Sequence, residues 1–264
     1  MPAPADVWPS VSQERLRRVT IVEIRPPANR SEHRAALARL IDRAGWADPL
    51  ADERVATLEA YAAKRGLSLD HCLIACHAGR IEAVCMSLDA PGRTSSILLS
   101  PGIAQPRWRD VAVEMVTRAQ AEAATRNVQL LQGMVAQECT DDALVYAAAG
   151  FRHLARLLYL QTDSPAPSHR VQDTEWVTYS PATHDLFARV ILDSYEQSLD
   201  CGSLNGLRDI EDILASHKAT GQFEPSNWRL AQVGDETVGV ILMAHMEEQH
   251  AYEVVYMGCL PRWR

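Results

Sequence analysis

Hydrophobic positions along the chain follow two different periods, and their alternation predicts a mixed α/β fold. A period of three to four residues is typical of helices that pack on a core, and a period of two is typical of strands. The first part of the chain is predicted to contain, in order, a strand over 19–24, helices over 31–44 (with Ser31 as N-cap) and 52–64, strands over 72–77, 81–88 and 94–99, a helix over 108–126, a strand over 128–135, a helix over 141–149 and a strand over 153–161.

A small, polar and proline-rich segment, Thr162–Ser168, then interrupts the periodic pattern and has the composition of a linker. After it the order of elements begins again. We expect a strand over 176–179, helices over 184–197 and 209–220, and strands over 228–233, 238–246 and 251–259. The pattern therefore predicts two domains, residues 1–162 and 175–264, joined by a linker over 163–174.

A four-residue motif supports an internal duplication. The sequence Pro106–Arg109 recurs as Pro261–Arg264, at an offset of 155 residues. Two further pairs share this offset: Gly79 with Gly234, and Pro26 with Pro181. The alternative is a single large α/β domain in which the match is accidental. Because the first copy continues to residue 161 after its motif and the second does not, we expect the second copy to comprise only the N-terminal two thirds.

The segment Tyr252–Arg264 resembles the central strand of the GNAT superfamily of N-acetyltransferases. In that superfamily the strand ends at a hydrophobic-x-Pro step, followed by Gln or Arg and a glycine-rich turn that opens a helix. Arg264 matches the Gln or Arg position. The resemblance implies an α/β fold with a mixed sheet, two such domains in tandem, and acetyl-CoA as co-substrate.

The resemblance also implies roles for individual residues. Backbone groups of Met257, Gly258 and Cys259 would pair with the amide arm of acetyl-CoA as an added strand, and Arg264 would begin the loop that binds the pyrophosphate. Gly258 would mark the bulge that splays the two central strands. An ordinary core strand is the alternative for these residues.

The first copy departs from the family pattern. Asp110 and Glu114 follow Arg109 where the glycines should stand. Carboxylates suit the N-terminus of a helix but repel a pyrophosphate, so we expect this copy to be degenerate and not to bind acetyl-CoA. We also expect the chain as given to be inactive, and a longer version with a glycine-rich turn after Arg264 to be active.

Acetyl transfer to an amine requires a group that takes the amine proton and a group that serves the leaving thiolate. Glu253 is the candidate base, because a carboxylate inside an apolar strand needs a reason; alternation would also allow it to face solvent. Tyr256 is the candidate general acid, with aromatic core packing as its alternative. Cys259 is given no role as a nucleophile, since the family's mechanism needs no covalent intermediate.

The net charge of −8 argues against a general nucleic-acid binder and against attraction to anionic membranes. The first residues, Met1–Asp6, do not resemble a secretory signal, so a cytoplasmic protein is expected. Cys72 and Cys76 would share one face of a strand, where buried thiols are favoured over a metal site, and no metal is expected.

Together these features predict an acetyl-CoA-dependent N-acetyltransferase that acts on an amine of a small molecule or peptide, with its active site in the second domain. The alternative is a non-catalytic module of the same fold that binds an acyl-CoA or another small ligand. Fold alone does not distinguish the two.

Overall fold

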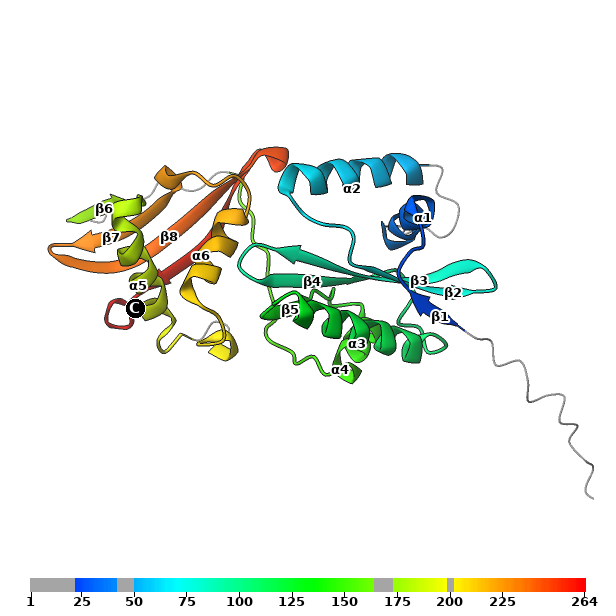
Figure 1. Ribbon diagram of the computed structural model, residues 1–264. Coiled ribbons are helices and arrows are strands. Elements are labelled where there is room, and N and C mark those ends of the chain that lie inside the picture. Colours follow the sequence, from blue (N-terminus) through cyan, green and yellow to red (C-terminus); the bar gives the residue numbers. More distant parts are fainter. Residues whose placement is uncertain (1–21, 42–49, 164–172, 199–201) are drawn as a thin grey trace, which may run out of the picture.

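The computed structural model describes residues 22–41, 50–163, 173–198 and 202–264, which form two separate sheets with flanking helices (Figure 1). The first sheet has five strands in the order β1-β2-β3-β4-β5, and the second has four in the order β6-β7-β8-β9. Within the described ranges, no helix has the length and apolar character needed to cross a membrane.

The first half contains β1 (Glu23–Arg25), α1 (Arg30–Ile41), α2 (Ala51–Arg65), β2 (Cys72–His77), β3 (Arg80–Ala90), β4 (Thr94–Leu99), α3 (Arg109–Thr125), β5 (Leu130–Gly133) and α4 (Thr140–Ala148). Strands β1 to β4 are antiparallel to one another, whereas β4 and β5 are parallel and α3 connects them. The sheet is therefore mixed, as the sequence predicts.

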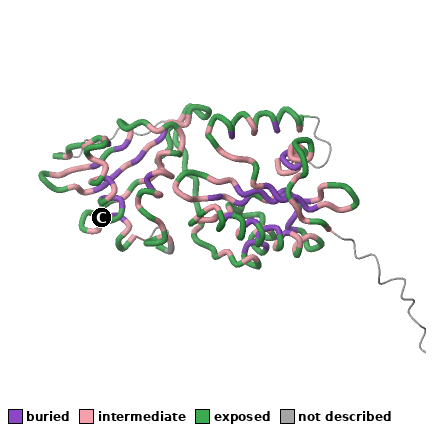
Figure 2. The backbone as a smooth tube through the Cα atoms, in the orientation of Figure 1, coloured by how far each residue is buried: buried purple, intermediate pink, exposed green. Residues whose placement is uncertain are grey.

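Alternating residues of the central strands supply two hydrophobic cores, one on each face of the first sheet. Leu73 and Cys85 pack with α3 and α4, while Ile74 and Val84 pack with α1 and α2. Each face of the sheet is thus covered by a pair of helices, and buried residues concentrate along the central strands (Figure 2).

The second half contains β6 (Thr174–Thr178), α5 (His184–Tyr195), α6 (Ile210–Ala219), β7 (Trp228–Val233), β8 (Glu236–Met246) and β9 (Ala251–Cys259). All strand pairs in this sheet are antiparallel. Trp228 and Leu230 point to the face that α5 and α6 cover. The opposite face exposes apolar side chains: Trp176 is 53%, Val254 53% and Met257 69% exposed.

The two halves share a detailed strand register, but at an offset that differs from the one in the sequence. Ile74 pairs with Val84, and Leu230 pairs with Val240, so the hairpins correspond at an offset of 156. The same offset relates the irregularity after Ala75 to the one after Ala231. A shift of one residue would exchange the two faces of each strand.

The four-residue motif consequently does not mark equivalent positions. Leu99 pairs with Cys85, and Met257 pairs with Ile241, so these two strand residues correspond. Pro106 lies in turns that lead to α3, well beyond Leu99, whereas Pro261 opens a short 3-10 turn directly after β9. The match between the motifs is a poor guide to the alignment.

Other expectations also needed correction. The residues expected as a last strand over 153–161 form no strand, because no described strand pairs with them. Helix α1 begins at Arg30 and is capped by Asn29, whose side-chain oxygen accepts from the Glu32 N–H at 3.0 Å; Ser31 is not the cap. Most of the expected linker, and much of the strand expected over 19–24, lie outside the described residues.

A turn of the first half docks against α6 of the second. The turn connects β3 with β4, and the guanidinium of its last residue, Arg93, forms an ion pair with Asp212. The Gly92 carbonyl accepts a hydrogen bond from Arg208 Nη2 at 3.0 Å. Gly92 has a φ of +80°, and a Cβ added there would collide with the Asp212 carbonyl oxygen, so this close approach requires glycine.

Candidate functional site

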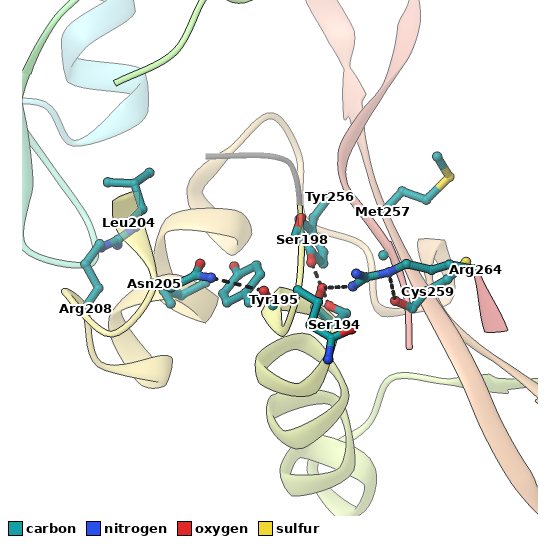
Figure 3. Close-up of a pocket in the computed structure, with 13 residues that line it drawn as sticks. Ser194, Tyr195, Ser198, Leu204, Asn205, Arg208, Tyr256, Met257, Cys259 and Arg264 are labelled. Atoms are coloured by element: carbon teal, nitrogen blue, oxygen red, sulfur yellow. Dashed lines mark hydrogen bonds between the residues drawn. The ribbon is translucent and has the colours of Figure 1, made fainter. Parts of the chain in front are cut away.

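A cavity of about 590 Å³ lies where the C-terminal end of α5, the segment that leads to α6 and the end of β9 meet (Figure 3). Its walls combine aromatic and apolar groups with hydroxyls, amides and two arginines. The lining residues are Ser194, Tyr195, Gln197, Ser198, Leu204, Asn205, Arg208, Ile213, Tyr256, Met257, Gly258, Cys259 and Arg264.

The cavity brings together most of the residues that the sequence singles out. Tyr256, Met257, Gly258, Cys259 and Arg264 all line it. Glu253 does not line the cavity and is exposed, which is the alternative that the alternation of the strand allowed. Glu253 pairs with Ala244, and across an antiparallel pair its side chain lies on the same face of the sheet as that of Tyr256, which pairs with Leu242.

The free edge of β9 presents backbone hydrogen-bonding groups. The Leu260 N–H donates to the Val238 carbonyl at 2.9 Å, so the pair Val240–Gly258, two residues along, is also hydrogen-bonded. The intervening residues Met257 and Cys259 therefore direct their N–H and C=O groups away from β8. Strand β9 has β8 as its one strand neighbour among the described residues, so no strand covers this edge, where the Cys259 carbonyl accepts one hydrogen bond from Arg264 Nε at 3.1 Å.

Gly258 allows β9 to approach α5 closely, but it is not the bulge. A Cβ added at Gly258 would lie 2.7 Å from both Ser194 Oγ and Tyr256 Oη. The irregularity in the β8–β9 register falls between Leu242 and Met243, opposite Val255. The expectation that Gly258 marks the bulge is therefore wrong. A glycine is required at this position because a side chain would collide with Ser194 and Tyr256.

The Tyr256 side chain is held on several sides. Its hydroxyl lies 2.7 Å from Ser194 Oγ. Its ring stacks on the His217 imidazole, with centroids 5.6 Å apart, and meets the Tyr195 ring edge-on at 5.5 Å. These contacts fix the phenol at the cavity wall and leave it in reach of a bound molecule.

His217 and Arg208 are functional candidates that the sequence analysis did not identify. Burial and the nearby charge of Arg208 lower the pKa of His217 to about 4, so the imidazole is neutral at pH 7. His217 Nε2 is buried without a hydrogen-bond partner in the described part of the chain, and so is Arg208 Nε. Burial also lowers the pKa of Arg208. One sequence signal was available for His217: it follows Ile213 by four residues on the buried face of α6.

Arg264 makes two hydrogen bonds to backbone carbonyls beside the cavity. Its Nη2 donates to the Ser194 carbonyl at 2.7 Å, and its Nε donates to the Cys259 carbonyl at 3.1 Å. A cation at the C-terminus of a helix satisfies terminal carbonyl groups and interacts favourably with the helix dipole. Arg264 thereby ties the end of α5 to the end of β9.

The corresponding place in the first half is filled by a side chain. Strands β4 and β5 pair as far as Ile97 and Gly133, and β4 then continues to Leu99 without β5. The Tyr146 hydroxyl donates to the Ile97 carbonyl at 3.0 Å, and a Cβ added at Gly133 would lie 2.6 Å from the Tyr146 ring. Burial raises the pKa of this tyrosine. The point where β4 and β5 separate is thus occupied.

The three cysteines of strands β2 and β3, Cys72, Cys76 and Cys85, have a structural role. Cys72 and Cys76 both pack against the core under α1 and α2, and burial raises the pKa of the Cys72 thiol to about 12. Among the described ranges, no group of three or more His, Cys, Asp or Glu side chains could hold a metal ion.

Comparison with known proteins bears on the fold. No protein-family model matches the sequence, and no curated protein sequence matches it. The structure is similar to that of a GCN5-related N-acetyltransferase from Sphaerobacter thermophilus, with 18% sequence identity and a TM-score of 0.51, over 92% of this chain and 77% of that chain. This likeness shows that the chain has the mixed α/β fold of GCN5-related N-acetyltransferases, the GNAT fold.

Two further solved structures match about half of the chain. One is a transcriptional regulator from Bacillus halodurans C-125, with 17% identity and a TM-score of 0.38, over 54% of this chain and 100% of that chain. The other is the aminoglycoside N-acetyltransferase AAC(6')-Iy in complex with CoA, with 17% identity and a TM-score of 0.38, over 56% of this chain and 99% of that chain.

Proposed function

We propose that the second half is an acetyl-CoA-dependent N-acetyltransferase that transfers the acetyl group to an amine of a small molecule or peptide. The observation that carries this proposal is the free edge of β9 beside the cavity. Met257 and Cys259 direct backbone groups outward there, and the Tyr256 hydroxyl stands at the same wall. An amide-rich arm can pair with such an edge as an added strand, and the acceptor amine would enter the cavity.

The reaction forms a C–N bond and breaks the C–S bond of the thioester, and two protons must move. Tyr256 Oη is the candidate donor to the leaving thiolate, because it is fixed by Ser194 and by the His217 ring. Glu253 remains our candidate for receiving the amine proton. Its exposure would let the proton pass to solvent, and its face is the one on which Tyr256 lies.

We also propose that residues 1–162 and 175–264 are two copies of the GNAT fold, joined over 163–174, with a degenerate first copy. The common register of β2–β3 and β7–β8 supports this, since both hairpins have an irregularity at the same place. Tyr146 supports the degeneracy, because it fills the place where β4 and β5 separate.

Amide hydrogen exchange tests the proposed function directly. The Met257 and Cys259 N–H groups should exchange quickly in the free protein and become protected when acetyl-CoA is added. Gly258, whose N–H points to β8, should change little and serves as an internal control. Acetyl-CoA that binds without protecting Met257 and Cys259, or does not bind, would contradict the proposal.

The second candidate function is a non-catalytic module that binds an acyl-CoA or a small ligand at the same place. One observation favours it: Glu253, the candidate base, lies outside the cavity lining. A module would show the same amide protection but no thiol release with any amine, and Glu253→Gln would then leave binding unchanged.

A further inference from the structure

The charge of the cavity is opposite to that of the chain as a whole. The chain carries a net charge of −8, whereas the thirteen described residues that line the cavity include two arginines and no aspartate or glutamate. Low-dielectric walls of one sign concentrate ligands of the other sign. The cavity is therefore suited to an anionic group and unsuited to a polycation.

Arg208 forms no ion pair with any described residue, although the Asp212 carboxylate lies near enough to interact with its charge. Its Nη2 donates to three neutral oxygens, namely the Gly92 carbonyl, the Asp212 carbonyl and Ser216 Oγ. The carboxylate of Asp212 is paired with Arg93 instead, through Arg93 Nε at 2.7 Å. Arg208 Nε has no partner within the described residues. One end of the guanidinium is thus anchored, and its positive charge forms no ion pair in the part of the chain that the structure describes.

The two arginines stand at opposite sides of the cavity, with the aromatic rings of Tyr195 and Tyr256 between them (Figure 3). Arg264 is engaged with backbone carbonyls beside β9, on the side of the free edge. Arg208 is on the far side, next to Leu204 and Asn205. An amine held near the Tyr256 hydroxyl would therefore extend its other end toward Arg208.

We propose that the acceptor is a small amine that also carries an acidic group, a carboxylate or a phosphate, and that Arg208 binds this group. The inference rests on the proposed function, in that the acceptor enters this cavity. A guanidinium held at one end offers its remaining N–H groups in a fixed orientation, which suits a planar or tetrahedral oxyanion. The first half takes part in this recognition, because its Gly92 carbonyl orients Arg208.

Calorimetry on the full chain tests the proposal with matched amines. 4-Aminobutyrate should bind at least about tenfold more tightly than butylamine, or phosphoethanolamine than ethanolamine, since a hydrogen bond to a charged group is worth a factor of this order. The pair of amines whose two members differ in affinity shows whether the acidic group is a carboxylate or a phosphate. Spermidine, a polycation, should bind more weakly than either acid.

Variants then assign the effect to Arg208. Arg208→Gln should abolish the preference for the acidic amine, and Arg208→Lys, which keeps the charge, should retain part of it. Lys64→Gln is the matched control, because it removes an ion pair with Glu247 between the halves and touches neither the cavity nor Asp212. It should leave the preference intact.

Three results would overturn the inference. Equal binding of acidic and neutral amines would do so without any variant. An equal loss in Lys64→Gln and Arg208→Gln would mean that Arg208 only joins the halves. Inorganic phosphate that binds as tightly as phosphoethanolamine would show that the amine contributes nothing. Acetyl-CoA protection of Met257 and Cys259 is measured separately, so the proposed function can stand when this inference fails.

Discussion

The hydroxyl oxygens of Tyr256 and Ser194 lie 2.7 Å apart at the wall of the cavity. Ser194 Oγ also donates its single proton to the Ile191 carbonyl at 2.7 Å. Because a serine hydroxyl has one proton to donate, the proton between the two side chains belongs to Tyr256. Ser194 Oγ therefore accepts the hydrogen bond from the Tyr256 hydroxyl. In this way a residue of α5 fixes the orientation of the tyrosine side chain on β9.

This relationship predicts the effect of removing the Tyr256 hydroxyl. Tyr256→Phe should lower the rate of acetyl transfer by about 100-fold or more, the usual contribution of general acid catalysis, while acetyl-CoA affinity stays within about twofold of the parent. The measurement is thiol release, expressed as the ratio of variant to parent.

Ser194→Ala provides the control for that prediction, since it removes the partner and keeps the phenol. Its rate should fall less than that of Tyr256→Phe. If Tyr256→Phe transfers acetyl as fast as the parent, the phenol has no part in the chemistry and its role is aromatic packing with Tyr195 and His217.

The second half shows most clearly what the sequence predicts well. Strands β7 and β9 begin and end where the apolar alternation and its turns place them, at Trp228–Val233 and Ala251–Cys259. These strands are bounded by polar turns, so their limits are set locally. The resemblance named the end of β9 as part of an acetyl-CoA site; a cavity lies at that end of the strand, and the roles of its residues stay predictions.

Where the sequence failed, the cause lies in contacts between distant residues. The run Leu157–Leu160 has the composition of a strand, yet a strand needs a partner and none pairs with it in the described chain. Matching Gly79 with Gly234 gave an offset that is one residue too small. In the strand register Gly234 corresponds to Ala78, and both residues have a positive φ, 58° and 48° respectively. Ser194 and His217 both contact Tyr256 through tertiary packing, and apart from the helical spacing of His217 from Ile213 no local motif identifies them.

The buried imidazole of His217 should make stability depend on pH. Burial lowers its pKa to about 4 from the usual 6.5, so between these values the unfolded chain binds more protons than the folded one. The stability that His217 contributes is complete above about pH 6.5 and is lost as the pH falls toward 4. The full difference amounts to at most about 3 kcal/mol.

Denaturant unfolding at pH 7.5 and pH 4.5 measures this dependence. His217→Phe keeps an aromatic ring against Tyr256 and removes the titration, so it should reduce the loss of stability between the two pH values. A parent and variant that lose the same stability over this interval would show that carboxylates, and not His217, govern the acid sensitivity.

Gly258 should tolerate no side chain. In Gly258→Ala the added methyl group would meet Ser194 Oγ and Tyr256 Oη at 2.7 Å, which must push β9 away from α5. We expect a loss of about 1–3 kcal/mol of unfolding free energy, the usual cost of overpacking, together with weaker ligand binding in the cavity. Gly202→Ala is the matched control, because no atom lies within 4 Å of its added Cβ. Equal melting temperatures for the two variants would contradict the close contact.

The exposed apolar segment after α4 should promote self-association. Leu158 is 75% and Leu160 is 93% exposed, and an extended apolar segment without a strand partner invites pairing between chains. Replacing both by Ser should reduce concentration-dependent light scattering with little change in melting temperature, since neither side chain is buried. Leu73→Ser, at a position 3% exposed in the core, should instead unfold the protein more easily. Unchanged scattering in the double variant would contradict the prediction. It would instead favour self-association through the exposed apolar face of the second sheet around Trp176 and Met257.

The first half should not bind acetyl-CoA, for two independent reasons. Asp110 places a negative charge in the first turn of α3, where a pyrophosphate would need N–H groups free of acidic neighbours. The Tyr146 hydroxyl donates a hydrogen bond to the Ile97 carbonyl at the point where β4 and β5 separate. A ligand arm that paired with β4 there would have to displace this buried side chain. Acetyl-CoA added to the full chain should therefore leave the amide exchange of Leu99, whose N–H points away from β3, unchanged while it protects Met257 and Cys259. Asp110→Asn and Tyr146→Ala, each made alone, should not create binding, because each leaves the other obstacle in place. Protection at Leu99 in the parent chain would refute the prediction and make the first half a site of acetyl-CoA binding.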